Sequence, residues 1–479
     1  MKPDILKQQP HTRRSFFDSV GNGIAATALA QLLSHDLYGE EHPAGTVHGP
    51  HHTPRAQAVI HLFMNGGPSQ MDLLDPKPEL DRNHGKDHFD AIAGEVENPT
   101  AAGALMRCPY KFSQHGECGM DVSDALPHLA GCVDDIALIR SMYTVNLTHE
   151  PALYKIHSGR QIGGRPSMGS WVTYGLGTEN RNLPAYVVLD DPLGLPINGT
   201  QNWQSGFLPP VHQGTRFRAT GSPVLNLTPD YKQPEPVADL KQDLIARLDR
   251  IHRTARPGNP NLDARIAGYE LAARMQLAAG DALDLSQETA ATQAAYGLNH
   301  KTTESYGRRC LIARRLIERG VRFVQLFINA QIFDNHTNLE SGLKSACERT
   351  DQPIAALLKD LKQRGLLEET LVVWGGEFGR LPIAQLPADK NPSGAGRDHN
   401  KNAMCTWMAG GGIKGGVIHG ATDELGFAAV EDRVTVPDWH ATILHLLGLH
   451  HEELFINHAG LRERLTSVFE ANVIQNILA

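Results

Sequence analysis

The sequence predicts an α/β fold in which a mostly parallel central sheet is flanked by helices. First, short apolar runs alternate along the chain with helical stretches, which is the pattern of buried parallel strands covered by helices. Second, the helical stretch 306–319 ends at Gly320 and leads directly into an apolar run, as an αβ unit does. The 479 residues suffice for one large domain with insertions.

The elements follow from local patterns, taken in chain order. Short apolar segments predict strands at residues 58–64, 136–140, 185–189, 321–327, 371–374 and 404–408. Helical spacing predicts helices at residues 151–157, 306–319, 352–364 and 437–447. The Pro-, Gly- and Asn-rich stretch 190–236 predicts irregular surface loops, and the alanine-rich stretch 238–295 predicts a helical insertion. We therefore expect a single α/β domain over residues 55–479.

Composition excludes several classes of protein. Lys and Arg number 45 against 53 Asp and Glu, a formal charge of -8, so no basic surface for nucleic acid is expected. None of the six cysteines forms a C-x-x-C pair, which leaves a zinc knuckle unsupported, although Cys108 is a candidate for a disulfide with Cys118 or Cys132. The 24 His favour a metal or hydrolytic site, because imidazole is the commonest metal ligand.

The amino terminus has the pattern of an export signal. Arg13 and Arg14 precede a weakly apolar run at residues 20–33, which is shorter than the about 20 apolar residues that span a bilayer. The pattern is similar to twin-arginine signals and predicts a protein exported to the periplasm or cell envelope. The signal and its linker occupy residues 1–54; an uncleaved signal would be the only membrane anchor. The alternative is an ordinary amphipathic helix that starts at Ser15.

Polar residues follow the predicted strands, at the sheet edge where α/β proteins bind ligands. Asn65 comes directly after the first strand, beside glycines that also suit a plain structural turn. Thr148 and His149 precede the helix that contains Pro151 in its first turn, so the Thr148 hydroxyl is a candidate nucleophile facing the helix dipole, with His149 as ligand or base. The alternative role of Thr148 is that of a helix cap.

Acidic and imidazole side chains recur further along the chain. Asp334 and His336 follow one strand, while Glu377 and Arg380 follow another. The loop that precedes the last strand ends in Arg397, Asp398 and His399, and it must fold back over the carboxyl edge to join the others. Together the acidic and imidazole residues among these, with Asn65, predict a site for one or two divalent ions, Zn or Mn by ligand type, with Mg or Ca as further candidates. A buried Glu377–Arg380 salt bridge is the structural alternative for that pair.

The chain resembles the bacterial family known as domain of unknown function 1501, within the alkaline phosphatase and sulfatase superfamily. The resemblance extends from residue 58 to the carboxyl terminus. It rests on the motifs NGGPS at 65–69, DPKP at 75–78, THE at 148–150, PSMGSW at 166–171, FDNH at 333–336, EFGR at 377–380, GRDH at 396–399 and the glycine-rich 415–424.

The superfamily implies two divalent metals at the strand ends and a nucleophile at a helix start. This chain departs from that pattern at Asn65, where the superfamily has a carboxylate, and at Glu377-Phe378, where an Asp-His pair is usual. The formylglycine motif C-x-P/A-x-R of true sulfatases is absent, because Cys310, the one cysteine with an arginine four residues on, has Ile312 where the motif requires Pro or Ala.

These observations predict an exported, metal-dependent hydrolase of phosphate or related anionic esters. Arg380 or Arg397 would hold the anionic group by paired hydrogen bonds. Two alternatives remain open. One is a cell-envelope binding or scaffold protein that keeps the fold without turnover, and the other is a sulfatase-like enzyme without formylglycine. The substrate, the metal and the oligomeric state are not specified by the sequence.

Overall fold

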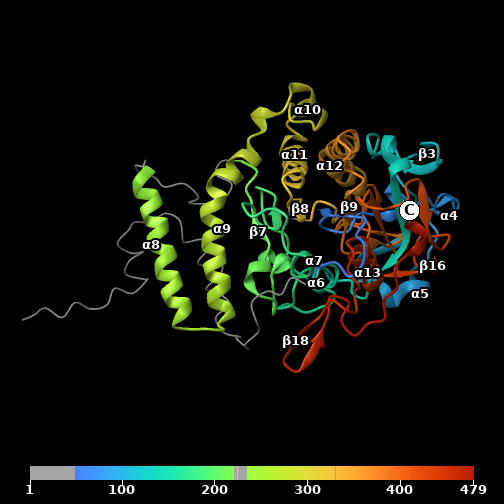
Figure 1. Cartoon of the computed structure of the whole chain (residues 1–479). Coiled ribbons are helices and arrows are strands. Elements are labelled where there is room, and N and C mark those ends of the chain that lie inside the picture. Colours follow the sequence, from blue (N-terminus) through green and yellow to red (C-terminus); the bar gives the residue numbers. More distant parts are fainter. Residues whose placement is uncertain (1–48, 221–223, 225–234, 329–330) are drawn as a thin grey trace, which may run out of the picture.

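The computed structural model describes residues 49–220, 224, 235–328 and 331–479 (Figure 1). The predicted export signal at residues 13–33 lies outside these ranges, so its prediction stays untested. Within them, the helices are all too short or too polar to cross a membrane.

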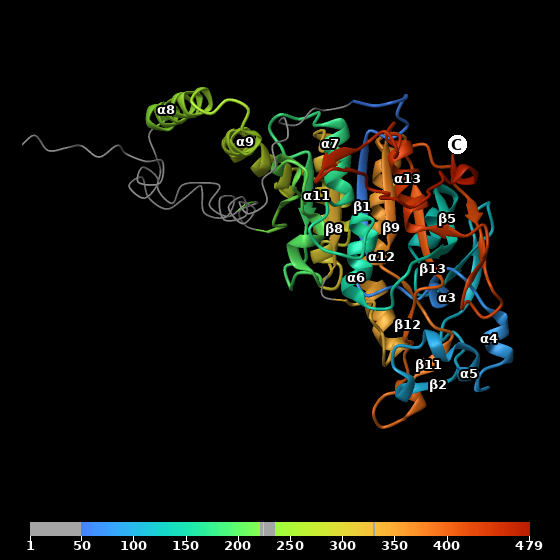
Figure 2. The same ribbon diagram turned by 90° about the horizontal axis from the view of Figure 1, so that it is seen from below.

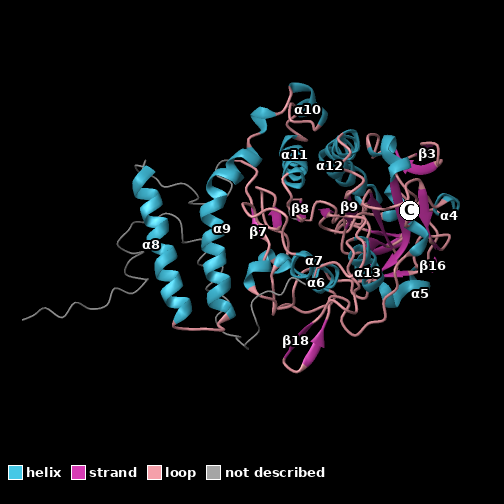
Figure 3. Ribbon diagram, viewed as in Figure 1, coloured by secondary structure: helices cyan, strands magenta, loops and turns pink. Residues whose placement is uncertain are grey.

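A central mixed sheet is formed by nine strands of the described residues (Figure 3). They are β1 (Ala58–Phe63), β5 (Ile136–Tyr143), β6 (Tyr186–Leu189), β7 (Thr215–Arg216), β8 (Phe323–Phe327), β9 (Thr370–Gly375), β13 (Met404–Ala409), β14 (Val417–His419) and β17 (Val434–Thr435). Their order is β14-β5-β13-β9-β1-β8-β6-β7, and β17 pairs with β5 off this path. All six predicted strands are present, which confirms the α/β fold class.

One strand of the sheet runs against the others. β1 pairs in parallel with β8 and β9, with Ile60 opposite Val324 and Val372, whereas β13 is antiparallel to both β9 and β5. The start of β13 therefore lies at the edge where the parallel strands end. This reversal is the physical reason why a motif that precedes its strand reaches the same edge as motifs that follow theirs.

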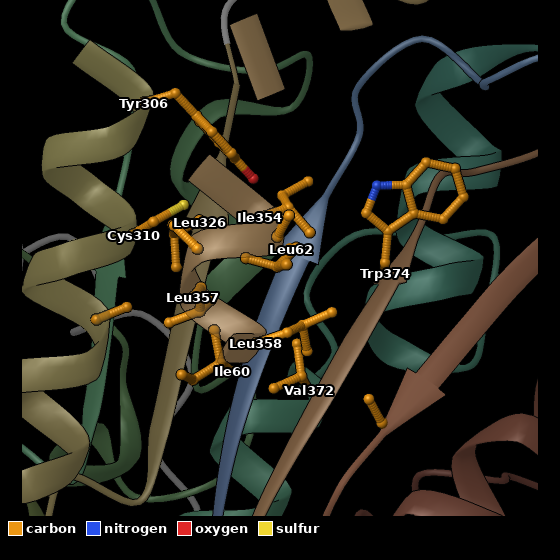
Figure 4. Packing of buried hydrophobic residues seen from close by; sticks show 14 of the residues in the cluster. Ile60, Leu62, Tyr306, Cys310, Leu326, Ile354, Leu357, Leu358, Val372 and Trp374 are labelled. Atoms are coloured by element: carbon orange, nitrogen blue, oxygen red, sulfur yellow. The ribbon is translucent and has the colours of Figure 1, made fainter. Parts of the chain in front are cut away.

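Five longer helices cover the two faces of the sheet. They are α6 (His149–Ser158), α7 (Met168–Leu176), α11 (Glu304–Glu318), α12 (Leu339–Gln363) and α13 (Val436–Leu446). Ile60 and Leu62 of β1 pack with α11 and α12, as Figure 4 shows. Val59 and Phe63 point to the other face and pack with α6, α7 and α13. Because both faces of the strand are buried, its sequence is apolar on both faces apart from His61.

The helix predicted at 352–364 is the second half of the longer α12. Pro353 lies inside this helix. Because proline favours the first turn of a helix, the sequence pattern places the start of α12 too late. Three short helices follow β1 along the chain: α3 (Gln70–Leu73), α4 (Pro78–Arg82) and α5 (Phe89–Ile92).

The stretch expected to form a helical insertion contains three helices. They are α8 (Glu235–Thr254), α9 (Pro260–Leu283) and α10 (Ala290–Ala295). Figures 1 and 2 show α8 as the outermost of them, with α9 between α8 and the rest of the molecule.

Small two-stranded sheets complete the described fold. The pairs are β10 (Gly379–Arg380) with β12 (His399–Asn400), β11 (Ile383–Gln385) with β2 (Ala102–Leu105), β3 (Phe112–His115) with β4 (Met120–Ser123), β15 (Ala421–Thr422) with β16 (Ala429–Glu431), and β18 (Ile456–His458) with β19 (Leu461–Glu463). The first two pairs lie beside the ends of the parallel strands (Figure 2) and carry residues of the candidate site.

The candidate disulfide is not formed, since all six cysteines lie in the described ranges and are free thiols. The Sγ atom of Cys108 lies 3.9 Å from the Asp72 carbonyl, whereas that of Cys132 lies 3.8 Å from the Ala355 carbonyl on α12. Cys118 Sγ donates to the carbonyl of His115. The three thiols therefore contact separate parts of the structure.

A cluster of buried histidines lies between the sheet and its second helical layer. His61 of β1, His157 of α6 and His440 of α13 are each at most 2% exposed, and the rings of His61 and His157 are 5.8 Å apart. Burial lowers the pKa of His61 and of His440 to about 3, and lowers the pKa of His157 well below its usual value. These imidazoles are therefore neutral in the folded protein.

This cluster makes stability depend on pH. Below about pH 6.5 the unfolded chain binds protons that the folded cluster excludes, so we expect the free energy of unfolding to fall as the pH drops toward 3. Three such histidines contribute up to about 4 kcal/mol per pH unit. Urea unfolding at pH 7 and pH 5 measures the effect. His61→Gln should reduce the pH slope by up to about 1.4 kcal/mol per pH unit; an unchanged slope in this variant would contradict the assignment.

Candidate metal centre

Four side chains from distant parts of the sequence meet at the carboxyl edge of the sheet. His149 is the first residue of α6, which follows β5. Asp334 and His336 lie in the loop after β8, and His399 lies in β12, shortly before the reversed strand β13. Each comes from a segment that the central sheet directs to this edge, so the rigid strands fix the positions of the four side chains.

Asp334 is the centre of the group. Its Oδ2 atom lies 3.2 Å from His149 Nε2, and its Oδ1 atom lies 2.9 Å from His336 Nε2 and 3.2 Å from His399 Nε2. One ligand atom from each of the four residues lies within 4.8 Å of all the others. Three imidazole nitrogens and a carboxylate thus face one small volume, which is the donor set of a transition-metal site.

The opposite nitrogen of each imidazole lies close to an oxygen atom from a second ring of residues, as a hydrogen bond for His149 and His336 and as an ion-pair contact for His399. These contacts are His149 Nδ1 to Glu377 Oε1 at 2.7 Å, His336 Nδ1 to Gln385 Oε1 at 2.5 Å and His399 Nδ1 to Glu97 Oε2 at 2.5 Å. With an ion bound at the centre, each Nδ1 would carry the hydrogen and each neutral ring would present its Nε2 lone pair to the ion. Metal-ligating histidines are oriented in the same way.

This arrangement requires positive charge at its centre. Lone pairs of neutral imidazoles would otherwise face the Asp334 carboxylate, whose Oδ2 lies 3.2 Å from the buried Nε2 of His149. Burial lowers the pKa of His149, but hydrogen bonds to Asp334 and Glu377 outweigh it and raise the pKa to about 9. Burial raises the pKa of Asp334, yet the three histidines and Arg380 bring it well below the usual range. A divalent cation fits the charge that these residues demand.

Glu377 holds His149 and does not reach the centre of the group. Its two carboxylate oxygens accept from the backbone N–H of Gly66 at 3.0 and 3.2 Å, and Oε1 also faces His149 Nδ1. Gly66 has φ +105°, and a Cβ atom there would lie 2.5 Å from the backbone nitrogen of Asp334. The glycine turn after β1 therefore lets two segments of the site approach closely.

The turn after β1 also carries Asn65, which is 2% exposed. Its Nδ2 donates to the carbonyl of Ile328 at 2.7 Å, while its Oδ1 has no hydrogen-bond partner among the described residues. Asn65 lies outside the four-residue group, and its role as a metal ligand stays a prediction.

Phe378 covers one side of the group. Its ring centroid lies 4.8 Å from that of His149 and 4.3 Å from that of His399. An apolar ring in this place keeps water from the two imidazoles and restricts their rotation, which strengthens electrostatic interactions at the centre.

The two arginines of the predicted site are both buried and both engaged. Arg380 donates from Nη2 to Asp334 at 2.6 Å, from Nε to the Gly67 carbonyl and from Nη1 to the Arg397 carbonyl. It therefore pairs with Asp334, and Glu377 pairs with His149, in place of the Glu377–Arg380 salt bridge that was the alternative.

Arg397 forms a paired salt bridge with Asp72, at 2.7 and 3.0 Å, and both side chains are fully buried. Its remaining N–H groups donate to backbone carbonyls, among them those of Pro382 and Met106. Arg397 is not placed to hold a substrate, because its donors are already used inside the protein.

Asp398 shapes the loop that carries His399. Its Oδ1 accepts from the backbone N–H of His399 at 2.8 Å, and its Oδ2 accepts from that of Asn98 at 2.9 Å. With Glu97 and His399 it forms a second, smaller group of metal-ligand type. Since this group uses the Nδ1 side of His399, it is better suited to orient that imidazole than to bind a separate ion.

Thr148 is the N-cap residue of α6 and is exposed. Its side chain makes no capping hydrogen bond within the described structure, so the capping role is not observed. Its hydroxyl stands at the start of a ten-residue helix, directly before the candidate ligand His149. This position suits the candidate nucleophile.

Sequence reasoning missed two residues of the outer ring, Glu97 and Gln385. Both lie in segments that join the group only through tertiary structure: Glu97 precedes β2, and Gln385 ends the partner strand β11. Neither has a strand-end motif around it, so no local signal was available to find them.

Comparison with known proteins supports a family assignment. The family model described as "Protein of unknown function (DUF1501)" matches residues 56–478. None of the curated proteins matches the chain in sequence.

Among solved structures, the lipoteichoic acid synthase of Listeria monocytogenes is 9% identical, with 85% of this chain and 76% of that chain covered and a TM-score of 0.38. The phosphonate monoester hydrolase of Silicibacter pomeroyi is 11% identical, with coverages of 88% and 76% and a TM-score of 0.37. A TAB5 alkaline phosphatase variant with bound Mg is 11% identical, with coverages of 83% and 99% and a TM-score of 0.34. The likeness concerns the fold and assigns no residue role or activity to this chain.

Proposed function

The chain belongs to the DUF1501 family, and from that premise we propose that it is a metal-dependent hydrolase of phosphate or related anionic esters. One observation carries the proposal: three imidazole Nε2 atoms and the Asp334 carboxylate converge on one volume, and each imidazole is fixed from behind by an oxygen acceptor. A donor set of three imidazoles and one carboxylate favours Zn or Mn over Mg or Ca, which prefer oxygen ligands.

His149, Asp334, His336 and His399 would hold the ion. When bound, a divalent ion supplies Lewis-acid stabilisation of the charge that develops on a transferring phosphoryl group. Glu377, Gln385 and Glu97 keep the three imidazoles in the tautomer that presents Nε2 to the ion. Arg380 keeps the Asp334 carboxylate oriented toward the histidines.

Thr148 would attack the ester. Its hydroxyl lies at the N-terminal end of α6, where free backbone N–H groups and the helix dipole favour an anionic substrate. Because Arg397 and Arg380 are engaged inside the protein, the start of α6 takes over the anion-binding role that the sequence suggested for the arginines. Phe378 limits the access of water to the imidazoles.

An ester screen tests this function. The purified protein would be loaded with Zn, Mn, Mg or Ca and offered phosphate monoesters, phosphate diesters, phosphonate esters and sulfate esters. We expect turnover of a phosphorus ester with Zn or Mn. Thr148→Ala should reduce kcat by at least about 10³-fold, as removal of a nucleophile does, while Thr148→Ser retains activity. Equal turnover by all three proteins would remove Thr148 from the mechanism.

A catalytically silent binding protein is the second candidate. Asn65 in place of a carboxylate and the Phe378 ring against His149 and His399 favour it, because both reduce the space and ligands for a second ion. Metal binding without hydrolysis of any ester in the screen would support this candidate. Turnover of sulfate esters alone would instead indicate a sulfatase-like enzyme without formylglycine.

We propose export by the twin-arginine route on the pattern of Arg13, Arg14 and the apolar run that follows. The expected result is that the intact protein reaches the periplasm or cell envelope, whereas the Arg13→Lys/Arg14→Lys double variant stays in the cytoplasm. Cell fractionation and immunoblotting measure this. Equal distribution of the two proteins would exclude the proposed signal.

A further inference from the structure

Helix α8 carries a stripe of exposed apolar side chains. Large hydrophobic residues that are well exposed number sixteen in the described residues, and five of them lie on this one helix. They are Val237 (41% exposed), Leu240 (67%), Leu244 (44%), Leu248 (38%) and Ile251 (67%). At about 100° per residue these positions fall within about 80° of one another around the helix, so they form one continuous stripe.

The other side of α8 faces α9. Asp249, on that side, is 4% exposed, and Arg253 pairs with Asp263 of α9 at 2.8 Å. Figures 1 and 2 show from two directions that α9 lies between α8 and the rest of the molecule. The stripe thus points away from the body of the protein, and a contiguous apolar face of this kind marks an interaction surface.

We propose that a second copy of this chain covers the stripe, with the two α8 helices packed antiparallel about a twofold axis at Leu244. The stripe is symmetric in sequence about this residue. Val237 and Ile251 both lie seven residues from Leu244, and Leu240 and Leu248 both lie four residues from it. When the second α8 helix runs antiparallel, Val237 of one copy lies opposite Ile251 of the other, and Leu240 lies opposite Leu248. Each contact then occurs twice, as it does in an isologous interface.

The charges beside the stripe favour the same orientation. Asp243 and Arg247 lie on one flank of the helix, and Arg250 lies further around on the same side. None of these three forms an ion pair within the described part of the chain. In the antiparallel pair Asp243 of one copy and Arg247 of the other lie on the same side of the interface, about 3 Å apart along the helix axis, whereas in a parallel pair this flank faces the opposite flank of the partner.

Sedimentation equilibrium of the full-length protein tests the association. We expect a concentration-dependent dimer of the 52.3 kDa chain. Leu244→Glu should raise the dissociation constant by about tenfold or more, because it places two carboxylates at the centre of the interface. Gln242→Glu adds the same charge on the opposite side of α8 and should leave the dimer unchanged. Circular dichroism checks that both variants fold.

Cysteine cross-linking tests the geometry independently, in a Cys118→Ser background that removes the exposed native thiol. Leu244→Cys should form an intermolecular disulfide under mild oxidation, and Gln242→Cys should not. Val237→Cys should cross-link only when mixed with Ile251→Cys.

Three results would overturn the proposal. The first is a monomer at all concentrations, as expected if another segment of the same chain, such as residues 1–48, covers the stripe. The second is a dimer unaffected by Leu244→Glu. The third is self-cross-linking of Val237→Cys, which indicates a parallel pair.

Discussion

Replacing Asp334 with asparagine is expected to abolish stoichiometric metal binding. The Asp334 carboxylate contacts the Nε2 atoms of all three histidines and also pairs with Arg380, so it is the one residue shared by every contact of the group. Asparagine keeps the size of the side chain but removes its charge, which leaves Arg380 buried without a carboxylate. Elemental analysis of the purified variant measures the loss.

Two control variants separate ligand loss from general damage. Asp284→Asn makes the same change at an N-cap residue outside the site, where asparagine also caps well, and should retain full metal content. Glu377→Gln keeps the four converging ligands but weakens the hold on His149, so we expect a loss of metal affinity of about 10- to 100-fold and not its abolition. Full metal stoichiometry in Asp334→Asn and His399→Ala would remove both residues from the ligand set.

The second large effect is on stability. Arg397→Met should lower the free energy of unfolding by about 3–5 kcal/mol, since it leaves the fully buried Asp72 carboxylate without its partner. Urea unfolding measures this change. Arg308→Met removes an arginine from a helix-surface pair with Glu304 and should cost less than about 0.5 kcal/mol.

This comparison also decides between two roles for Arg397. The structural role predicts a loss of stability with or without substrate. If the variant unfolds like the unmodified protein but fails to bind or turn over an anionic ester, then Arg397 contacts substrate after all, as its position beside Asp398 and His399 first suggested.

Most of the sheet was predictable because its strands are buried on both faces. Segment 371–374 is uniformly apolar and segment 58–64 is apolar apart from His61, and this signal needs no knowledge of the partners. The direction of β13 was not predictable, because an antiparallel strand buried in a parallel sheet has the same apolar composition. For the same reason the path of the loop before β13 was inferred from the position of its motif alone.

The candidate site was predictable where ligands stand at strand ends and not where they depend on tertiary contacts. His149 begins α6, His399 begins β12, and Asp334 and His336 lie in the loop between β8 and α12. The separate roles of Glu377 and Arg397 could not be deduced. A carboxylate near an arginine gives the same sequence pattern whether it binds a metal, orients a histidine or forms a buried ion pair. Those roles depend on which groups the fold leaves within about 3 Å, a distance that sequence spacing does not encode.

The reversed direction of β13 has a consequence for how this site varies among related chains. The chain leaves the sheet after β9 and returns through β13 at the same edge, so residues 376–403 form one excursion with fixed entry and exit points. That excursion alone contains Glu377, Arg380, Gln385, Asp398 and His399. Substitutions, insertions and deletions within this excursion can change the residues around the four-residue group without shifting any strand of the central sheet, so the surroundings of the candidate site can vary while the sheet stays the same.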